Sequence, residues 1–225
     1  MKKSFISIVV FFLTVCSVLA QVKVSENILS FSGVPINGTK AQIIKSLSTK
    51  GFEYSDLYDH LTGMFNGEEV TLKISTNHGV VDRIIVNYPY CSEGNDTRIK
   101  YNMLLSRFNR NDKYICINPR KEVPAEERIN RMLSDNSKYY DAVYFYLKQG
   151  SDPEQWANEY KKEYQKMYNK PLAGLSYEEM EEALFCLSNK ISEAVSGVVW
   201  FTMVSQHQIN INYINFKNRP RGEDL

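Results

Sequence analysis

The segment 61–90, LTGMFNGEEVTLKISTNHGVVDRIIVNYPY, constrains the fold more than any other part of the chain. Asn66-Gly67 stands between two runs of alternating apolar and polar residues, and an Asn-Gly pair readily adopts the positive φ angles of a two-residue hairpin loop. Asn77-His78-Gly79 is a second turn signal. Because side chains alternate between the faces of a strand, each run places its apolar set on one face. The segment therefore predicts a three-stranded antiparallel meander with one buried face and a polar or mixed outer face.

Segments with helical patterns surround this meander. Thr39 with Gln42 forms a capping-box pattern, and Gly51 is a typical helix end. Apolar residues at positions i, i+3, i+4 and i+7 indicate a second helix over 97–109. Pro124 suits the first turn of a third helix, and Ser151-Asp152-Pro153-Glu154 is a capping box that opens a fourth. A fifth helix is expected over 176–191.

Further strands are expected outside the meander. The run YYDAVYFYL, at 139–147, is strongly aromatic, a shorter strand is expected over 114–117, and 198–204 with 208–216 predict a C-terminal hairpin. Helices and strands do not alternate regularly, as they would around a parallel sheet. The predicted fold class is therefore α+β, with an antiparallel sheet made of the meander and the C-terminal hairpin and covered by about five helices.

The N-terminus, MKKSFISIVVFFLTVCSVLAQ, has the pattern of a secretory signal peptide. Lys2 and Lys3 precede an apolar stretch that is too short to span a bilayer comfortably, and small residues lead to an expected cleavage site after Ala20. A lipid anchor on Cys16 is the alternative. We therefore expect a secreted or periplasmic protein that begins at Gln21 and is not membrane-spanning.

After the expected signal peptide at 1–20, the chain can be divided into two segments, although no clear linker separates them. Residues 21–117 form a helix-plus-meander unit, and 118–225 form a second α+β segment that we expect to pack with the first as one domain; whether the second is a diverged repeat stays open. The 27 basic residues lose Lys2 and Lys3 on cleavage, which leaves them one short of the 26 acidic residues. A near-neutral chain favours no nucleic acid partner.

The turn and packing residues of the first unit carry a resemblance. Its motifs are G-x-P-I-x-G-T at 33–39, K-G-F at 50–52 and L-x-G-x-F-x-G at 61–67. They resemble a group of uncharacterised secreted proteins of Bacteroidota-type bacteria, and the arrangement is loosely similar to beta-lactamase-inhibitor-like and outer-membrane assembly lipoproteins. The resemblance implies a binding or envelope role and carries no functional residue across.

Catalytic and metal-binding patterns are weak. The three histidines, His60, His78 and His207, have no metal-ligand spacing, so no metal or other cofactor is expected. Cys91, in the loop YPYCSEGND, could act as a nucleophile if the fold brought His78 or His207 to it. Cys116 and Cys186 follow the pattern of core residues, and Cys91 could pair with Cys116 if the strand ends meet. Asp56 and Asp59 are interpreted as turn residues.

Two surfaces are candidate binding sites. The outer face of the meander carries Lys73, Arg83, Ile85 and Asn87. Tyr140, Tyr144 and Tyr146 share one face of their strand, either as part of a central strand covered on both sides or as an exposed row that grips a partner or a sugar. Asn210 and Asn212 could form a polar recognition face beside that row.

These patterns favour a non-catalytic binding protein over an enzyme. The expected partner is another envelope or extracellular protein, with an oligomeric state that the sequence leaves open. The alternatives are an exported hydrolase that uses Cys91 and a glycan-binding module that uses the tyrosines.

Overall fold

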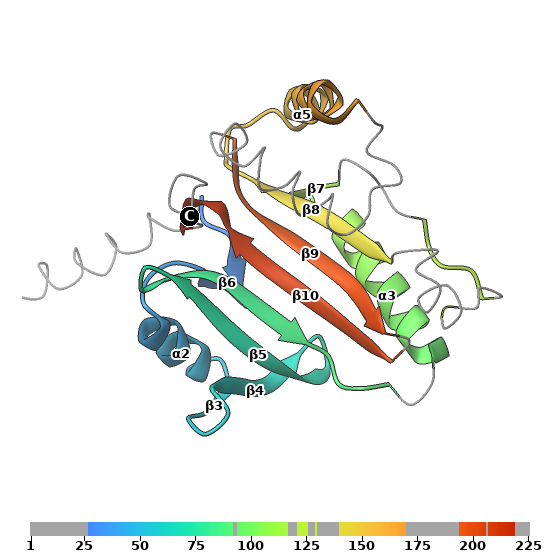
Figure 1. The fold of residues 1–225 in the computed structure, drawn as a ribbon. Coiled ribbons are helices and arrows are strands. Elements are labelled where there is room, and N and C mark those ends of the chain that lie inside the picture. The colour runs from blue at the N-terminus through green and yellow to red at the C-terminus, as the bar shows by residue number, and fades with distance from the viewer. Residues whose placement is uncertain are drawn as a thin grey trace, which may run out of the picture.

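One eight-stranded antiparallel sheet dominates the part of the chain that the computed structural model describes, which is residues 27–91, 94–116, 121–125, 129, 140–169, 194–205 and 207–218 (Figure 1). Its strand order is β3-β4-β5-β6-β10-β9-β8-β7, and β1 and β2 form a separate two-stranded sheet. The strands are β1 Ser30–Phe31, β2 Val34–Pro35, β3 Glu53–Ser55, β4 His60–Phe65, β5 Glu68–Asn77, β6 Val80–Asn87, β7 Tyr114–Ile115, β8 Asp141–Leu147, β9 Val195–Ser205 and β10 Gln208–Asn215. The helices are α2 Lys40–Ser48, α3 Gly94–Asn109 and α5 Pro153–Tyr168, and a 3-10 turn, η2, covers Phe216–Asn218.

The predicted meander is confirmed as β4, β5 and β6. Asn66 and Gly67 both have positive φ angles, as the two-residue hairpin loop requires, and His78 and Gly79 repeat this geometry at the second turn. One face of β5 and β6 buries most of their apolar residues, whereas Lys73 and Ile85 lie on the other face. The local turn chemistry and the alternation thus set the register of these three strands.

The C-terminal hairpin is confirmed as β9 and β10, and it joins the meander edge to edge. β10 pairs with β6 on one side and with β9 on the other. β9 in turn pairs with β8, the aromatic strand, and the short β7 lies at the far edge. The sheet therefore contains strands from both sequence segments, and the meander is only one part of it.

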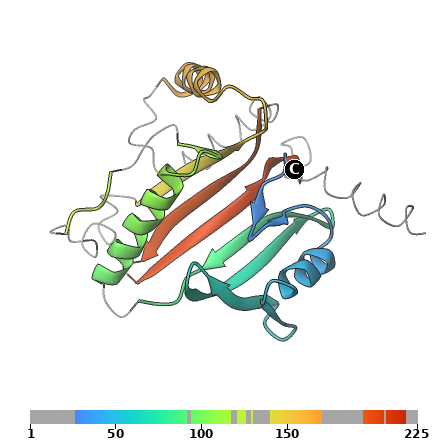
Figure 2. The same ribbon diagram turned by 180° about the vertical axis from the view of Figure 1, so that it is seen from behind.

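The two faces of the sheet carry different cores. Helices α2 and α3 pack on the first face; Figure 2 shows α3 crossing it. As the helical spacing predicts, Tyr101, Leu104 and Leu105 of α3 are buried there. On the second face, α5 packs Trp156, Tyr160 and Tyr164 against residues of β8 and β9, which form a smaller core. Met167, near the end of the same helix, is exposed.

The predicted helix starts are confirmed at two positions. Thr39 and Gln42 make the reciprocal bonds of a capping box at the start of α2. At α5 the helix starts within one residue of the prediction, but the expected capping box of Ser151 with Glu154 is wrong. The N-cap is Asp152, whose side chain accepts from the N–H groups of Glu154 and Gln155, with Pro153 in the first turn.

The expected balance of helices and strands is wrong. Within the described residues the protein is mostly antiparallel sheet, with three α-helices rather than about five covering it. The meander and the hairpin account for five of the eight strands of the main sheet, and β3, β7 and β8 extend it. The helix expected over 176–191 and most of the one expected after Pro124 lie outside the described residues, as do the predicted signal peptide and Cys186. No helix in the described ranges is long and apolar enough to cross a membrane.

Candidate functional site

The second face of the sheet carries a polar surface where α5 does not pack. Lys73 of β5 lies opposite Ile85 of β6, and Ile85 lies opposite Asn212 of β10. In the next row Asn87 lies between Thr71 and Asn210. Directly opposite residues share a face, so the structure brings the two Asn residues of the hairpin beside the predicted meander residues. We call this surface the polar face; it comprises Thr71, Lys73, Ser75, Arg83, Ile85, Asn87, Asn210 and Asn212.

The polar face has unused charge and hydrogen-bonding capacity. Lys73 and Arg83 are diagonal neighbours, because Arg83 lies opposite Ser75, two residues along β5 from Lys73. Neither cation forms an ion pair within the described ranges, where the pairs are Lys40–Asp59, Lys100–Glu68 and Lys166–Glu163. Arg83 Nε and Asn210 Oδ1 are both buried without a hydrogen-bond partner in the described part of the chain. Buried polar atoms are usually paired, so these two atoms need an explanation.

The tyrosine row lies on the opposite face of the sheet. Tyr140 and Tyr144 are only 3% and 1% exposed, and Tyr146 packs partly buried against the same core. The Tyr144 hydroxyl donates to Asn109 Oδ1 at 2.8 Å, and its ring stacks on Phe201. Burial raises the pKa of Tyr144 well above the usual tyrosine value. The interpretation of these rings as an exposed row is therefore wrong; β8 is a central strand covered on both sides.

Cys91 and His207 meet, but not as a nucleophile and its base. The Cys91 N–H donates to the His207 carbonyl oxygen at 2.7 Å, and His207 Nδ1 lies 2.8 Å from the Cys91 carbonyl oxygen. The Cys91 thiol lies 3.9 Å from the Pro89 carbonyl oxygen, and Cys91 is 8% exposed. A cysteine nucleophile needs its base within hydrogen-bonding distance of sulfur, whereas this imidazole contacts the backbone. The arrangement fastens the loop after β6 to the β9–β10 turn.

Lys100 lies beside this contact on α3. Its amine pairs with Glu68 at 2.5 Å and lies 5.3 Å from the centre of the Tyr88 ring. Burial lowers the pKa of Lys100, but the hydrogen bond that its amine donates to Glu68 and the charge of Glu68, with a smaller contribution from Cys91, outweigh that effect and raise the pKa overall. Lys100 is thus held as a cation, which favours a structural ion pair over proton transfer.

The connection between β3 and β4, residues 56–59, is a surface that the sequence patterns did not single out. Its Leu57 is 82% exposed, the largest exposure among the large hydrophobic residues of the described chain, and the adjacent Tyr58 is 68% exposed. The only signal in the sequence is an apolar pair between two Asp residues in a turn. We call this segment the β3–β4 loop.

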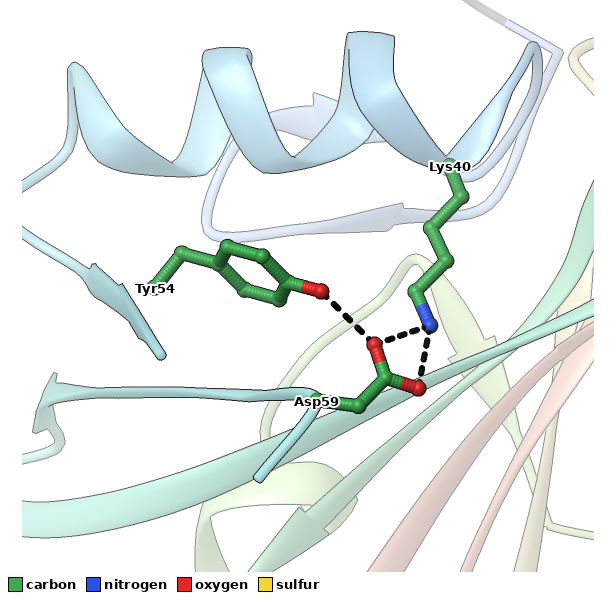
Figure 3. A network of polar contacts seen from close by, with 3 residues as sticks. All are labelled: Lys40, Tyr54 and Asp59. Atoms are coloured by element: carbon green, nitrogen blue, oxygen red, sulfur yellow. Dashed lines mark hydrogen bonds and ion pairs between the residues drawn. The ribbon is translucent and has the colours of Figure 1, made fainter. Parts of the chain in front are cut away.

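Asp59 holds the β3–β4 loop against α2 (Figure 3). Lys40 Nζ lies 2.5 Å and 2.6 Å from the two carboxylate oxygens of Asp59, and the Tyr54 hydroxyl donates to Asp59 Oδ1 at 2.7 Å. These hydrogen bonds, that from Lys40 first, hold the pKa of the Asp59 carboxyl below its usual range. Asp59 itself has a φ of 52°, a left-handed conformation that is uncommon outside glycine.

Within the described ranges, no group of three or more His, Cys, Asp and Glu residues is arranged so that it could hold a metal ion.

The comparisons with known proteins find no relative of this chain. No family model matches it, and the searches of curated proteins and of solved structures find no match.

Proposed function

We propose that the protein is an exported, non-catalytic binding protein whose polar face contacts another envelope or extracellular protein. The observation that supports this most is the pair of cations on that face. Lys73 and Arg83 are neighbours without an ion pair in the described structure, and Arg83 Nε is buried without a partner. An interface that supplied acceptors to these groups would remove the unmet hydrogen-bonding capacity.

The setting of the polar face suits recognition. Asn87, Asn210 and Asn212 carry amides that both donate and accept, and all three are partly exposed. They lie on paired strands in the middle of the sheet, so a partner would meet a rigid surface. Partly exposed Ile85, between Lys73 and Asn212, adds apolar contact area.

The experiment is a quantitative pull-down from the native envelope fraction with tagged protein that begins at Gln21. The double variant Lys73→Glu/Arg83→Glu reverses both charges of the polar face. A control, Lys45→Glu/Lys50→Glu, also reverses two positive charges, both of them exposed, on and just after α2. We expect one envelope protein to be enriched in proportion to the bait, and to bind the first variant about tenfold or more weakly, which corresponds to about 1.4 kcal/mol. Equal capture by both variants, or no specific capture, would overturn the proposal.

A further inference from the structure

We infer that the β3–β4 loop is a separate interaction site, a preformed knob that inserts Leu57 and Tyr58 into an apolar cleft with a basic rim on a partner protein. The inference does not rest on the polar face. It rests on three observations about the loop: the exposure of its two apolar side chains, the contacts that fix its backbone, and the charges around it.

The side chains of Leu57 and Tyr58 do not belong to the hydrophobic core of the described chain. Single exposed apolar side chains are common on protein surfaces, but here two large ones are adjacent and mostly in water. Tyr58 also stacks on His60, with ring centres 5.6 Å apart and an angle of 16° between the ring planes. The loop therefore presents a leucine, a tyrosine and an imidazole together. When aromatic and large apolar side chains become buried at the centre of a protein interface, a few of them carry most of the binding free energy.

The loop backbone is fixed before any partner arrives. Asp59 accepts from Lys40 and Tyr54, which ties the end of the loop to α2 and to β3 (Figure 3). The left-handed φ of Asp59, which Asp adopts more readily than most residues, turns its carboxylate toward these two donors. A loop held in one conformation loses less entropy on binding than a mobile one.

The charges near the knob favour a protein cleft over a lipid surface. Glu53 and Asp56 are both exposed beside it, and neither carboxylate forms a hydrogen bond or an ion pair within the described residues. Lys40, the cation that contacts the loop, is already paired with Asp59. An acidic margin opposes approach to an anionic bilayer and favours a partner with Lys or Arg around its cleft.

The shape of the loop indicates that the partner surface is concave. The β3–β4 loop projects beyond the edge of the sheet (Figure 1). A projecting tip can bury most of its surface only in a cleft, which is how apolar anchors reach the desolvated centre of an interface.

The test introduces a photo-crosslinking amino acid at position 58 of the full chain in its native cells. The same residue at position 99, where Ile99 of α3 is 52% exposed, is the control. We expect position 58 to give one main crosslinked protein that position 99 does not give. That protein is then identified and purified, and its affinity is measured for the wild type and for variants.

The affinity measurements decide the inference. We expect Leu57→Ala and Tyr58→Ala each to weaken binding about tenfold or more, Ile99→Ala to leave it unchanged, and Asp56→Lys to slow association at low salt. Asp59→Ala should also weaken binding, although both anchors remain. Lys73→Glu/Arg83→Glu should leave this affinity intact, which separates a failure of the knob from a failure of the polar face. The inference is overturned if position 58 gives no crosslink or only crosslinks to a second copy, if phosphatidylcholine or phosphatidylglycerol vesicles bind through Tyr58, or if the loop variants bind as tightly as the wild type.

Discussion

Asn87 of β6 lies directly opposite Asn210 of β10, although α3, β7, β8, α5 and β9 all lie between them in the sequence. This pairing joins the meander to the C-terminal hairpin and makes them one sheet. It also makes the polar face continuous, because the amides of the hairpin extend the meander surface with Lys73 and Arg83. A partner on this face would therefore contact both sequence segments at once.

The end of β10 is tied to the N-terminal part of the described chain by Asn215. Its side chain is buried, donates to the Ile36 carbonyl oxygen at 2.5 Å and accepts from the Lys217 N–H at 3.0 Å. Asn215→Ala leaves both backbone groups without these partners, so we expect the free energy of unfolding to fall by about 1–3 kcal/mol. Urea denaturation followed by circular dichroism measures this.

A matched variant on the same strand controls for the loss of an amide. Asn212 is partly exposed on the polar face, and Asn212→Ala should change the free energy of unfolding by about 0.5 kcal/mol or less. If Asn215→Ala and Asn212→Ala had equal effects, the contact with Ile36 would not stabilise the fold.

What the sequence could predict is what local chemistry decides. Asn66-Gly67 and His78-Gly79 specify their turns through positive φ angles, and alternation then decides which side chains are buried. Capping residues likewise mark the starts of α2 and α5. These signals act within a few residues, so the sequence alone was enough to predict the turns and the helix starts.

What the sequence could not predict depends on pairing between distant strands. Nothing near β8 shows that β9 and β7 flank it, so the tyrosines of β8 could be interpreted as exposed or as buried. The polar face needed the pairing of β6 with β10, and the role of Asp59 needed the approach of Lys40 across 19 residues. Leu57 and Tyr58 were missed because turn composition predicts a loop but does not show which side chains that loop exposes.

Tyr114 makes the stability of the β7 edge sensitive to high pH. Burial, with a smaller contribution from the charge of Tyr146, raises the pKa of Tyr114 from 10.0 to about 12. The fold therefore favours the neutral phenol. This contribution to stability is complete below the unfolded value of 10.0 and is lost as the pH rises from there through the folded value of about 12.

Tyr114→Phe tests this contribution directly. Because the variant cannot ionise at that position, its free energy of unfolding should fall less steeply than that of the wild type between pH 10 and about 12. The difference in tyrosinate absorbance between the two proteins gives the titration of Tyr114 itself. A midpoint near 10 would contradict the burial of this ring.

Cys91 should react slowly with thiol reagents. It is 8% exposed, and two contacts hold its backbone to His207. The Cys91 N–H donates to the His207 carbonyl oxygen, and the His207 imidazole contacts the Cys91 carbonyl oxygen. A reagent reaches the sulfur only after the loop opens. Maleimide labelling followed by peptide mass spectrometry should therefore find Cys91 labelled about tenfold or more slowly in the native than in the unfolded protein. Partly exposed Cys116 serves as the internal comparison, and labelling of Cys91 faster than in the unfolded chain would revive the nucleophile hypothesis.

Asp59 should control the ionisation of Tyr54 as well as the shape of the β3–β4 loop. The hydrogen bond to Asp59, with smaller contributions from burial and from the charges of Asp59 and Asp56, raises the pKa of Tyr54 above 10.0. Asp59→Asn removes the negative charge while keeping a residue type that tolerates the left-handed backbone. We expect the pKa of Tyr54 to fall toward 10.0 in this variant, measured from its ring resonances during an alkaline NMR titration. Little change in the melting temperature should accompany it, because the ion pair is exposed.

In the same network the pKa of Asp59 is lowered, whereas that of Tyr54 is raised, so the contribution of Asp59 to stability is lost at low pH instead of high pH. Because the folded pKa of the Asp59 carboxyl is lowered, its contribution is present above the unfolded value of 3.8 and is lost as the pH falls through the folded value. In a His60→Gln background, which removes the imidazole that stacks on Tyr58, the resonances of the β3–β4 loop should therefore stay in their native positions down to pH 3.8 and move together with the Tyr54 ring below it. Loop resonances that move at a higher pH while Tyr54 stays fixed would show that Asp59 does not hold the loop, and the preformed knob would lose its basis.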